Sequence, residues 1–262
     1  MTIANEVARI SLTGVHVPKA SDLLAKQIKE NIILGNIPDG AQLPTEKELV
    51  EQIGLSRPTV REALRILETE GLIAIKTGRG GGAVVRHPSS ESVTRPLALL
   101  LQFQKSRLSD LLEARRLVEP LIARLAAAHR TEEDLARIEN SLKLMGADLT
   151  DTRAFLDANV SFHIQVAAAS GNAVLNTLMS SLRDLIYQFS SEITIDIPTR
   201  RLTLLEHTAT YEGIKAGDPD LAANAMLEHH VSFDNYMAEH YGDLSSIMMT
   251  VNPRQFQPLN RR

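Results

Sequence analysis

The chain has 262 residues, of which 44% are hydrophobic, 23% charged and 4% aromatic, and it contains no cysteine. This length suffices for two modest domains, and the lack of cysteine excludes a disulfide-stapled scaffold, a thiolate metal site and a cysteine nucleophile. Because no apolar run reaches the roughly 18 residues that span a bilayer, and the N-terminus lacks a signal-peptide pattern, we expect a soluble, cytoplasmic protein without a membrane partner.

The formal net charge of −4 by itself disfavours binding to nucleic acid, since phosphate contacts require a positive surface. The charge is unevenly distributed, however. Residues 18–86 hold ten basic and nine acidic side chains, whereas residues 87–262 hold 17 basic and 22 acidic ones. The acidity therefore belongs to the C-terminal two-thirds of the chain, and the N-terminal segment remains compatible with DNA.

The N-terminal segment carries the pattern of three short helices. Apolar residues spaced four apart predict a helix from Ser21, a candidate N-cap, to Leu34. A second helix is expected after Thr45, which forms a capping-box pattern with Glu48. A third is expected after Ser56, where a proline in the first turn costs no hydrogen bond.

A glycine-rich stretch between two β-prone runs, 73–75 and 83–85, predicts a two-stranded hairpin. Its glycines would let Arg79 and the backbone approach a DNA groove. A phosphate-binding loop is excluded, because no Gly-Lys-Ser/Thr follows and the glycines end in a strand. Helix, turn, helix and hairpin in this order predict a winged helix-turn-helix domain over 18–86, whose second helix of the pair enters the major groove.

The expected recognition helix begins with side chains that suit DNA. Arginine reads guanine bidentately or grips a phosphate, and serine and threonine hydroxyls suit phosphate oxygens. Free N–H groups at the start of the helix also favour a phosphate. A solvated charged face is the alternative for such arginines, but the ordered set of helix, turn, capped helix and hairpin favours DNA. The candidate contacts are Ser56, Arg57, Thr59 and Arg61, together with Lys47 from the preceding helix.

Segments 43–49, 54–64 and 67–73 resemble the DNA-binding domain of GntR-family bacterial transcription regulators. One departure is the order Pro58-Thr59, which many members have reversed, so the base preference does not carry over. The resemblance implies DNA contacts at Lys47, Arg57, Thr59 and Arg61 and, on the wing, at Gly78.

Beyond this domain the sequence is helical throughout. Residues 87–93 have the composition of a linker, and we find no convincing strand after them. The fold class is therefore mostly α, with a seven-helix bundle over 94–241 that serves effector binding and dimerisation, and a loosely ordered tail over 242–262. The seven helical patterns lie near 94–104, 108–129, 132–147, 152–170, 172–192, 200–216 and 219–241.

Three histidines of the predicted bundle lie on apolar helical faces. Asn159 and His163 are one turn apart, and His207 and His229 share their faces with apolar neighbours. A lone histidine on such a face is commonly a core residue that finds a partner. Three of them on three helices of a cysteine-free bundle suit a zinc, nickel or manganese ion. His230 lies off the main apolar stripe and is the weaker candidate.

Arg115 is the candidate residue for binding an acidic effector, because a guanidinium inside a bundle requires a carboxylate. Two interpretations remain open. Arg115 either binds such a ligand or forms a buried ion pair with Glu119 or Glu113.

The C-terminal segment is similar to the effector domain of the FadR branch of the same family, on residues 113–115, 159–172, 206–218 and 225–229. The resemblance implies a small organic or sugar acid as effector. It also implies a metal held by one Asp or Asn and three His. The first ligand is most often Asp, so a neutral Asn would bind the ion more weakly or select a different one. The implied ligands here are Asn159, His163, His207 and His229.

We therefore expect a homodimeric transcription regulator, a repressor rather than an activator, that binds palindromic operator DNA. The dimer follows from the two-fold symmetry of operator half-sites. A small carboxylate, sensed through the metal, would shift the placement of the winged domains through the 87–93 linker.

Two rival hypotheses belong to other classes. A metal-dependent enzyme lacks a His-Glu-x-x-His helix, and Glu206 points about 100° away from the face of His207, so no general base is placed and we predict no enzymatic activity. In the other, the winged domain contacts a protein instead of DNA.

Overall fold

The computed structural model describes residues 18–76, 78, 81–87, 91–193 and 195–247. The chain divides into two compact units, Met1–Pro88 and Ser89–Arg262. Among the described residues, no helix is both long and apolar enough to cross a membrane.

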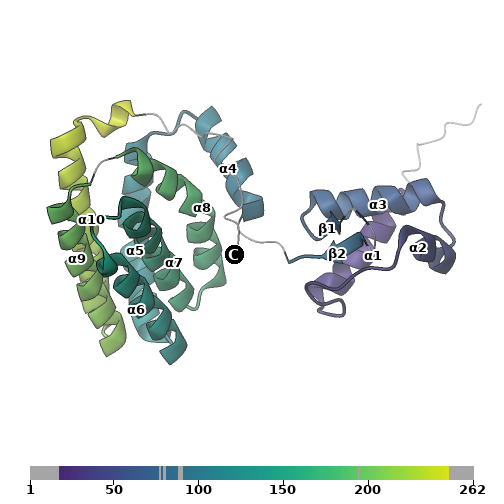
Figure 1. Cartoon of the computed structure of the whole chain (residues 1–262), viewed down its shortest axis with the longest axis horizontal. Helices are drawn as coiled ribbons and strands as arrows, with labels where there is room; N and C mark the ends of the chain where they lie inside the picture. The colour runs from purple at the N-terminus through teal and green to yellow at the C-terminus, as the bar shows by residue number, and fades with distance from the viewer. Residues whose placement is uncertain (1–17, 77, 79–80, 88–90, 194, 248–262) are drawn as a thin grey trace, which may run out of the picture. The chain divides into compact units, whose positions relative to one another are not determined.

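The N-terminal unit is a winged helix-turn-helix, as predicted (Figure 1). Its two strands pair antiparallel, with Ile73 opposite Val85 and Lys76 opposite Gly82. Its core is formed by apolar residues of the helices and strands, among them the fully buried Val60 and Leu67 of the third helix. The elements are α1 (Ala20–Ile33), α2 (Glu46–Ile53), α3 (Arg57–Thr69), β1 (Ile73–Lys76) and β2 (Gly82–Val85).

Local capping sets the starts of α2 and α3. The Thr45 hydroxyl accepts the Glu48 N–H, and the Glu48 carboxylate accepts the Thr45 N–H, which completes the predicted capping box. Ser56 caps α3 through the Thr59 N–H. The predicted cap of α1 is wrong, because that helix already begins at Ala20 and buries Ser21 within it. A serine side chain that packs into the core is not available as a cap.

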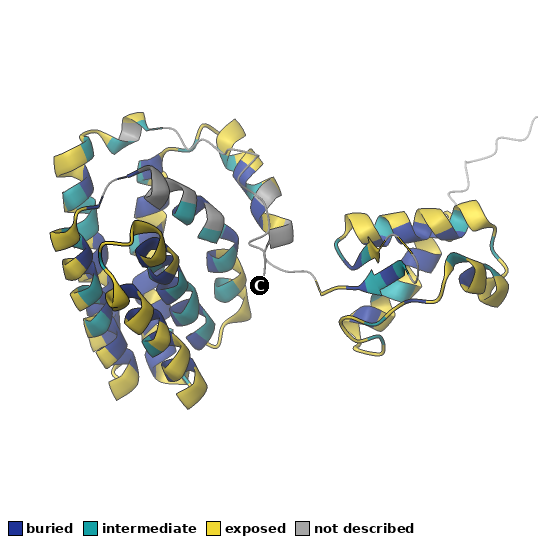
Figure 2. Ribbon diagram, viewed as in Figure 1, coloured by how far each residue is buried: buried dark blue, intermediate teal, exposed yellow. Residues whose placement is uncertain are grey.

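The C-terminal unit is a helical bundle, and seven α-helices lie in its described residues. Helix α10 packs against both α5 and α9, while α7 packs between α6 and α8. Figure 2 shows the buried residues on the inward faces of these helices. The bundle consists of α4 (Glu91–Phe103), α5 (Leu108–His129), α6 (Glu132–Ala147), α7 (Thr152–Ala169), α8 (Ala173–Glu192), α9 (Ile197–Ala216) and α10 (Pro219–Tyr241).

Three boundaries of this unit differ from the sequence-based expectation. Helix α4 begins at Glu91, inside the predicted linker, and α9 begins at Ile197 because Asp196 caps it. The tail is ordered at its start, since a 3₁₀ turn spans Leu244–Ser246 and the Leu108 N–H donates to the Ile247 carbonyl at 3.0 Å. These contacts add the first residues of the tail to the bundle. The rest of the predicted tail, 248–262, lies outside the described residues.

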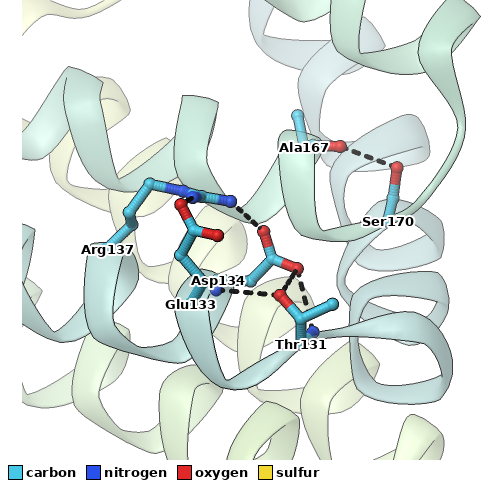
Figure 3. Close-up of polar contacts among 6 residues, drawn as sticks. All are labelled: Thr131, Glu133, Asp134, Arg137, Ala167 and Ser170. Carbon is cyan, nitrogen blue, oxygen red and sulfur yellow. Dashed lines mark hydrogen bonds and ion pairs between the residues drawn. The ribbon is translucent and has the colours of Figure 1, made fainter.

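Polar contacts fix the turn between α5 and α6. Thr131 and Asp134 form a reciprocal capping box, and Arg137 pairs with Asp134 (Figure 3). The end of α7 lies near this turn, because the His129 ring nitrogen Nδ1 contacts the Ser170 carbonyl at 2.8 Å. The C-terminal ends of helices α5 and α7, two of the helices that contribute to the candidate site, are thereby held together.

We predict that Thr131→Ala lowers the free energy of unfolding by about 1 kcal/mol, because the first turn of α6 loses its cap. Urea denaturation followed by circular dichroism measures this difference. The matched control is Thr177→Ala, which removes an exposed hydroxyl from the interior of α8. Equal stability of Thr131→Ala and the wild type would contradict the assigned role of the cap.

Candidate functional site

The predicted DNA contacts of the helix-turn-helix lie on one short stretch of the N-terminal unit. Arg57 and Arg61 are exposed on α3, and Lys47 is exposed near the start of α2. Ser56 and Thr59 are tied to each other, with 2.8 Å between their hydroxyl oxygens. Ser56 therefore has a structural role as the helix cap in addition to its expected role in DNA contact.

Arg61 is paired across the two helices. Its Nε and Nη2 atoms donate to the two carboxylate oxygens of Glu46 at 3.2 and 2.9 Å. The hydrogen bonds from Arg61 lower the pKa of the Glu46 carboxyl. This exposed pair orients the guanidinium, and an exposed pair contributes little stability, so DNA phosphates can compete for it.

The wing is described only in part. Gly78 is exposed with a φ of 107°, a backbone conformation that favours glycine. Arg79 lies outside the described residues. Its predicted contact with DNA stays a prediction.

In the C-terminal unit, the structure brings together the three predicted metal-binding histidines. His163 from α7, His207 from α9 and His229 from α10 are all buried, and each offers a nitrogen within 4.8 Å of the others. The Nε2 atoms of His207 and His229 are 3.2 Å apart. Helices distant in sequence thus place three imidazoles around one space.

These residues fit a divalent metal ion. Two ligand nitrogens of a tetrahedral zinc site are roughly 3.3 Å apart, given Zn–N bonds of about 2.0–2.1 Å. Polar atoms of His163, His207 and Asn159 are buried without a hydrogen-bond partner among the described residues. Asn159 Oδ1 is one of them, one helical turn before His163 on α7. Buried nitrogen and oxygen atoms left without partners are costly unless an ion or water satisfies them.

The protonation of these histidines also suits metal binding. Burial lowers the pKa of His163 to about 4, against the opposing effect of the Glu119 carboxylate. Burial and the neighbouring His229 hold the pKa of His207 well below its ordinary value. Both rings are therefore neutral near pH 7, and the neutral imidazole is the form that binds a metal.

A buried carboxylate, Glu119 on α5, lies beside this cluster. Its Oε1 accepts a hydrogen bond from Arg115 Nε at 2.6 Å. Its Oε2 contacts His163 Nδ1 and lies 3.3 Å from His230 Nε2. Burial by itself raises the pKa of Glu119, but the charge of Arg115, with the adjacent His163 and His230 rings adding to it, outweighs burial and holds this pKa well below the usual range. Glu119 is therefore an anion inside the bundle.

Arg115 forms one of the two ion pairs that the sequence allowed. It is buried and paired with Glu119, not with the exposed Glu113. Its Nη2 atom is buried and has no hydrogen-bond partner among the described residues. The guanidinium thus keeps a donor for a second anion.

Sequence reasoning missed the positions of three polar residues at this site. His230 is buried, contrary to its expected place off the apolar stripe, because α10 packs on two helices and buries a wide arc of its surface. Glu206, which was expected to point away from the face of His207, contacts His229 Nδ1 at 3.0 Å and so belongs to the polar residues of the site. Glu119 was expected only as an alternative partner of Arg115. Its position in a buried stripe of α5, four residues after Arg115, is a signal that could have placed it at the site.

Comparison with known protein families matches both units. The family of bacterial regulatory proteins named gntR matches residues 20–82, which span the helix-turn-helix and the first part of the wing. The FCD domain matches residues 110–232, which include all four predicted metal ligands and Arg115.

Two curated relatives share this organisation, and both are transcription regulators rather than enzymes. The chain is 32% identical over 218 residues to the HTH-type transcriptional regulator LutR of Bacillus subtilis, covering 79% of this chain and 96% of that protein. It is 34% identical over 212 residues to the galactonate operon transcriptional repressor of Escherichia coli, covering 79% of this chain and 92% of that protein.

A solved structure, Streptococcus agalactiae GntR, has a TM-score of 0.62 and 27% identity to this chain, covering 82% of this chain and 99% of that one. The order of domains, the winged helix-turn-helix and the helical C-terminal unit agree with these relatives. The chain belongs to the GntR family of bacterial transcription regulators, with an FCD domain as its C-terminal unit.

Proposed function

We propose that the chain is a homodimeric repressor that binds a palindromic operator and responds to a small carboxylate through a metal ion. The observation that carries this proposal is the convergence of His163, His207 and His229 from three helices. Asn159 would complete the ligand set. As a regulator of bacterial genes, the protein would act in the cytoplasm.

The DNA-binding part of the proposal rests on α3. Its exposed N-terminal turn presents Arg57 and Arg61, and its buried face is apolar, so the arginines can reach DNA without disturbing the core. An operator of two half-sites requires two winged domains related by a two-fold axis, which supports a dimer. The galactonate relative is a repressor, which favours the same direction of control here.

The effector part rests on Arg115 and the metal site. The unpartnered Nη2 of Arg115 and a metal ion held by His163, His207 and His229 would both attract a carboxylate. A hydroxyl group next to the carboxylate of the effector would give the effector a second atom that can bind the metal. The name of the galactonate relative supports a sugar acid or another hydroxy acid as effector, because galactonate is a sugar acid.

The metal would act as an electrostatic anchor for the effector, not as a catalyst. A metal-dependent hydrolase requires a general base placed to activate water. Glu206, the acidic residue next to His207, is engaged by His229 Nδ1. The Glu119 carboxylate is engaged by Arg115.

We predict that Arg57→Ala and Arg61→Ala each weaken operator binding by about 10- to 100-fold, because each removes a contact worth about 1–3 kcal/mol. A gel-shift titration against the promoter of the protein's own operon measures this effect. Arg65→Ala, an exposed position farther along α3, is the matched control and should bind as the wild type does. If the wild type gives no salt-sensitive shift at any concentration, the proposed function is wrong.

We predict one divalent metal ion per chain, and its loss in His163→Ala and His207→Ala. Plasma mass spectrometry of protein purified without chelators measures the metal content. Asn159→Asp should bind the ion more tightly than the wild type, because it adds a charged ligand, while Asn140→Asp on the exposed face of α6 should not. A metal-free wild type that gains no thermal stability from zinc, nickel or manganese would refute the site.

We predict that a hydroxy acid raises the melting temperature of the metal-loaded wild type and that Arg115→Lys loses most of this shift. Lysine has a single side-chain nitrogen, so it cannot hold Glu119 and present a second, fixed donor to the effector as Arg115 Nη2 does. A thermal-shift screen of organic and sugar acids, with and without metal, tests this. The control is Arg116→Lys, whose side chain pairs with Asp234 instead. An equal shift in wild type and Arg115→Lys would remove Arg115 from the effector site.

A further inference from the structure

We propose that Glu206 and Glu119 are positioning residues for the metal site. Each carboxylate lies against the Nδ1 of one histidine, where it favours the ring protonated at Nδ1 and thereby directs the Nε2 lone pair of that ring toward the space shared by α7, α9 and α10. Glu206 serves His229, and Glu119 serves His163. The inference rests on the proposed metal site and names the residues that orient it.

The Glu206–His229 pair shows the principle in its simplest form. Glu206 Oε2 on α9 lies 3.0 Å from His229 Nδ1 on α10. A carboxylate oxygen accepts in such a contact, so the contact favours the His229 tautomer with its proton on Nδ1. The lone pair is then on Nε2, the atom that lies 3.2 Å from His207 Nε2. The pair therefore selects the tautomer that can bind a metal inside the cluster.

The Glu119–His163 pair repeats this arrangement from another direction. Both side chains are almost fully buried, and Glu119 Oε2 contacts His163 Nδ1. Arg115 Nε donates to the other carboxylate oxygen, Glu119 Oε1, at 2.6 Å, which holds the carboxylate in place with Oε2 facing the His163 ring. Neither ring nitrogen of His163 has a hydrogen bond of normal geometry in the described part of the chain; Nδ1 is occupied by the contact with Glu119, and Nε2, at the other end of the ring, is buried. That atom is the one left for a metal.

A second group, Glu119, His163 and His230, also brings three ligand atoms within 4.8 Å of one another. We assign it no metal. Arg115 Nε is 2.6 Å from Glu119 Oε1, and a cation at Glu119 would lie next to this guanidinium and be repelled by it. His230 instead gives Glu119 a further contact, at 3.3 Å from Oε2, and so helps to fix the carboxylate against His163.

The test is the affinity of the full-length protein for zinc, measured by competition with a chromogenic chelator. Substitutions of such outer residues weaken metal binding about 10- to 100-fold. We expect a loss in this range for Glu206→Ala and for Glu119→Gln, because the single amide oxygen at position 119 cannot serve both Arg115 and His163. Glu206→Gln should lose less, because its amide oxygen can still accept the Nδ1–H of His229. The matched controls are Glu212→Gln on α9 and Glu113→Gln on α5, both exposed, which should bind zinc as the wild type does.

Cobalt provides a second measurement, because its visible spectrum reports the number and kind of ligands. If the two carboxylates only position the histidines, Glu206→Ala and Glu119→Gln should each bind one cobalt ion per chain with an unchanged number of ligands. A reduced ligand number in either variant would make that carboxylate a ligand and overturn the inference for it. Circular dichroism of each variant separates weakened metal binding from loss of fold. Glu119→Gln weakens the pair with Arg115 and can fail to fold; in that case Glu206→Gln still tests the positioning role.

The outcomes separate this inference from the proposed function. If the wild type binds one zinc ion and Glu206→Ala and Glu119→Gln bind it equally tightly, the metal site stands and the positioning role is refuted. If only one variant loses affinity, the role is refuted for the other carboxylate. If the wild type binds no metal at all, both the proposed site and this inference are wrong.

Discussion

The interior of the C-terminal unit depends on one buried negative charge, the carboxylate of Glu119. An ion removed from water is stable only if neighbouring groups replace its hydration. Arg115 neutralises it from the same helix, and His163 and His230 approach it from α7 and α10. Removal of one partner from such a buried pair typically costs about 3–5 kcal/mol. The orientation of Arg115 and that of His163 therefore depend on the same carboxylate, which joins the effector-binding candidate to the metal-binding candidate.

The buried histidine cluster suits metal binding better than it suits a stable hydrophobic core. Three imidazoles occupy the centre of a helical bundle, and Phe162 stacks on His207 at 4.2 Å between ring centroids. Apolar side chains would fill this space at lower cost, because buried polar atoms without partners are unfavourable. An ion that binds the ring nitrogens would recover this free energy on binding, so metal binding would also stabilise the fold.

The N-terminal unit has the opposite distribution of charged groups. Its interior is apolar, and its charges lie outside, where Arg61 pairs with Glu46 across α2 and α3. This distribution explains why a chain with a net charge of −4 can hold a DNA-binding domain. The acidic side chains are concentrated in the C-terminal unit, while Arg57 and Arg61 lie in the first turns of α3, where phosphates are also favoured by free N–H groups.

Sequence alone determined the features that depend on near neighbours. The caps Thr45 and Ser56 and the seven helical patterns were predictable because capping and helical periodicity act within about four residues of the chain. Tertiary structure alone decided which side chains meet across helices, such as Glu206 with His229. It also buried His230, because the arc of a helix that is covered depends on how many helices pack against it, and no local pattern encodes that number.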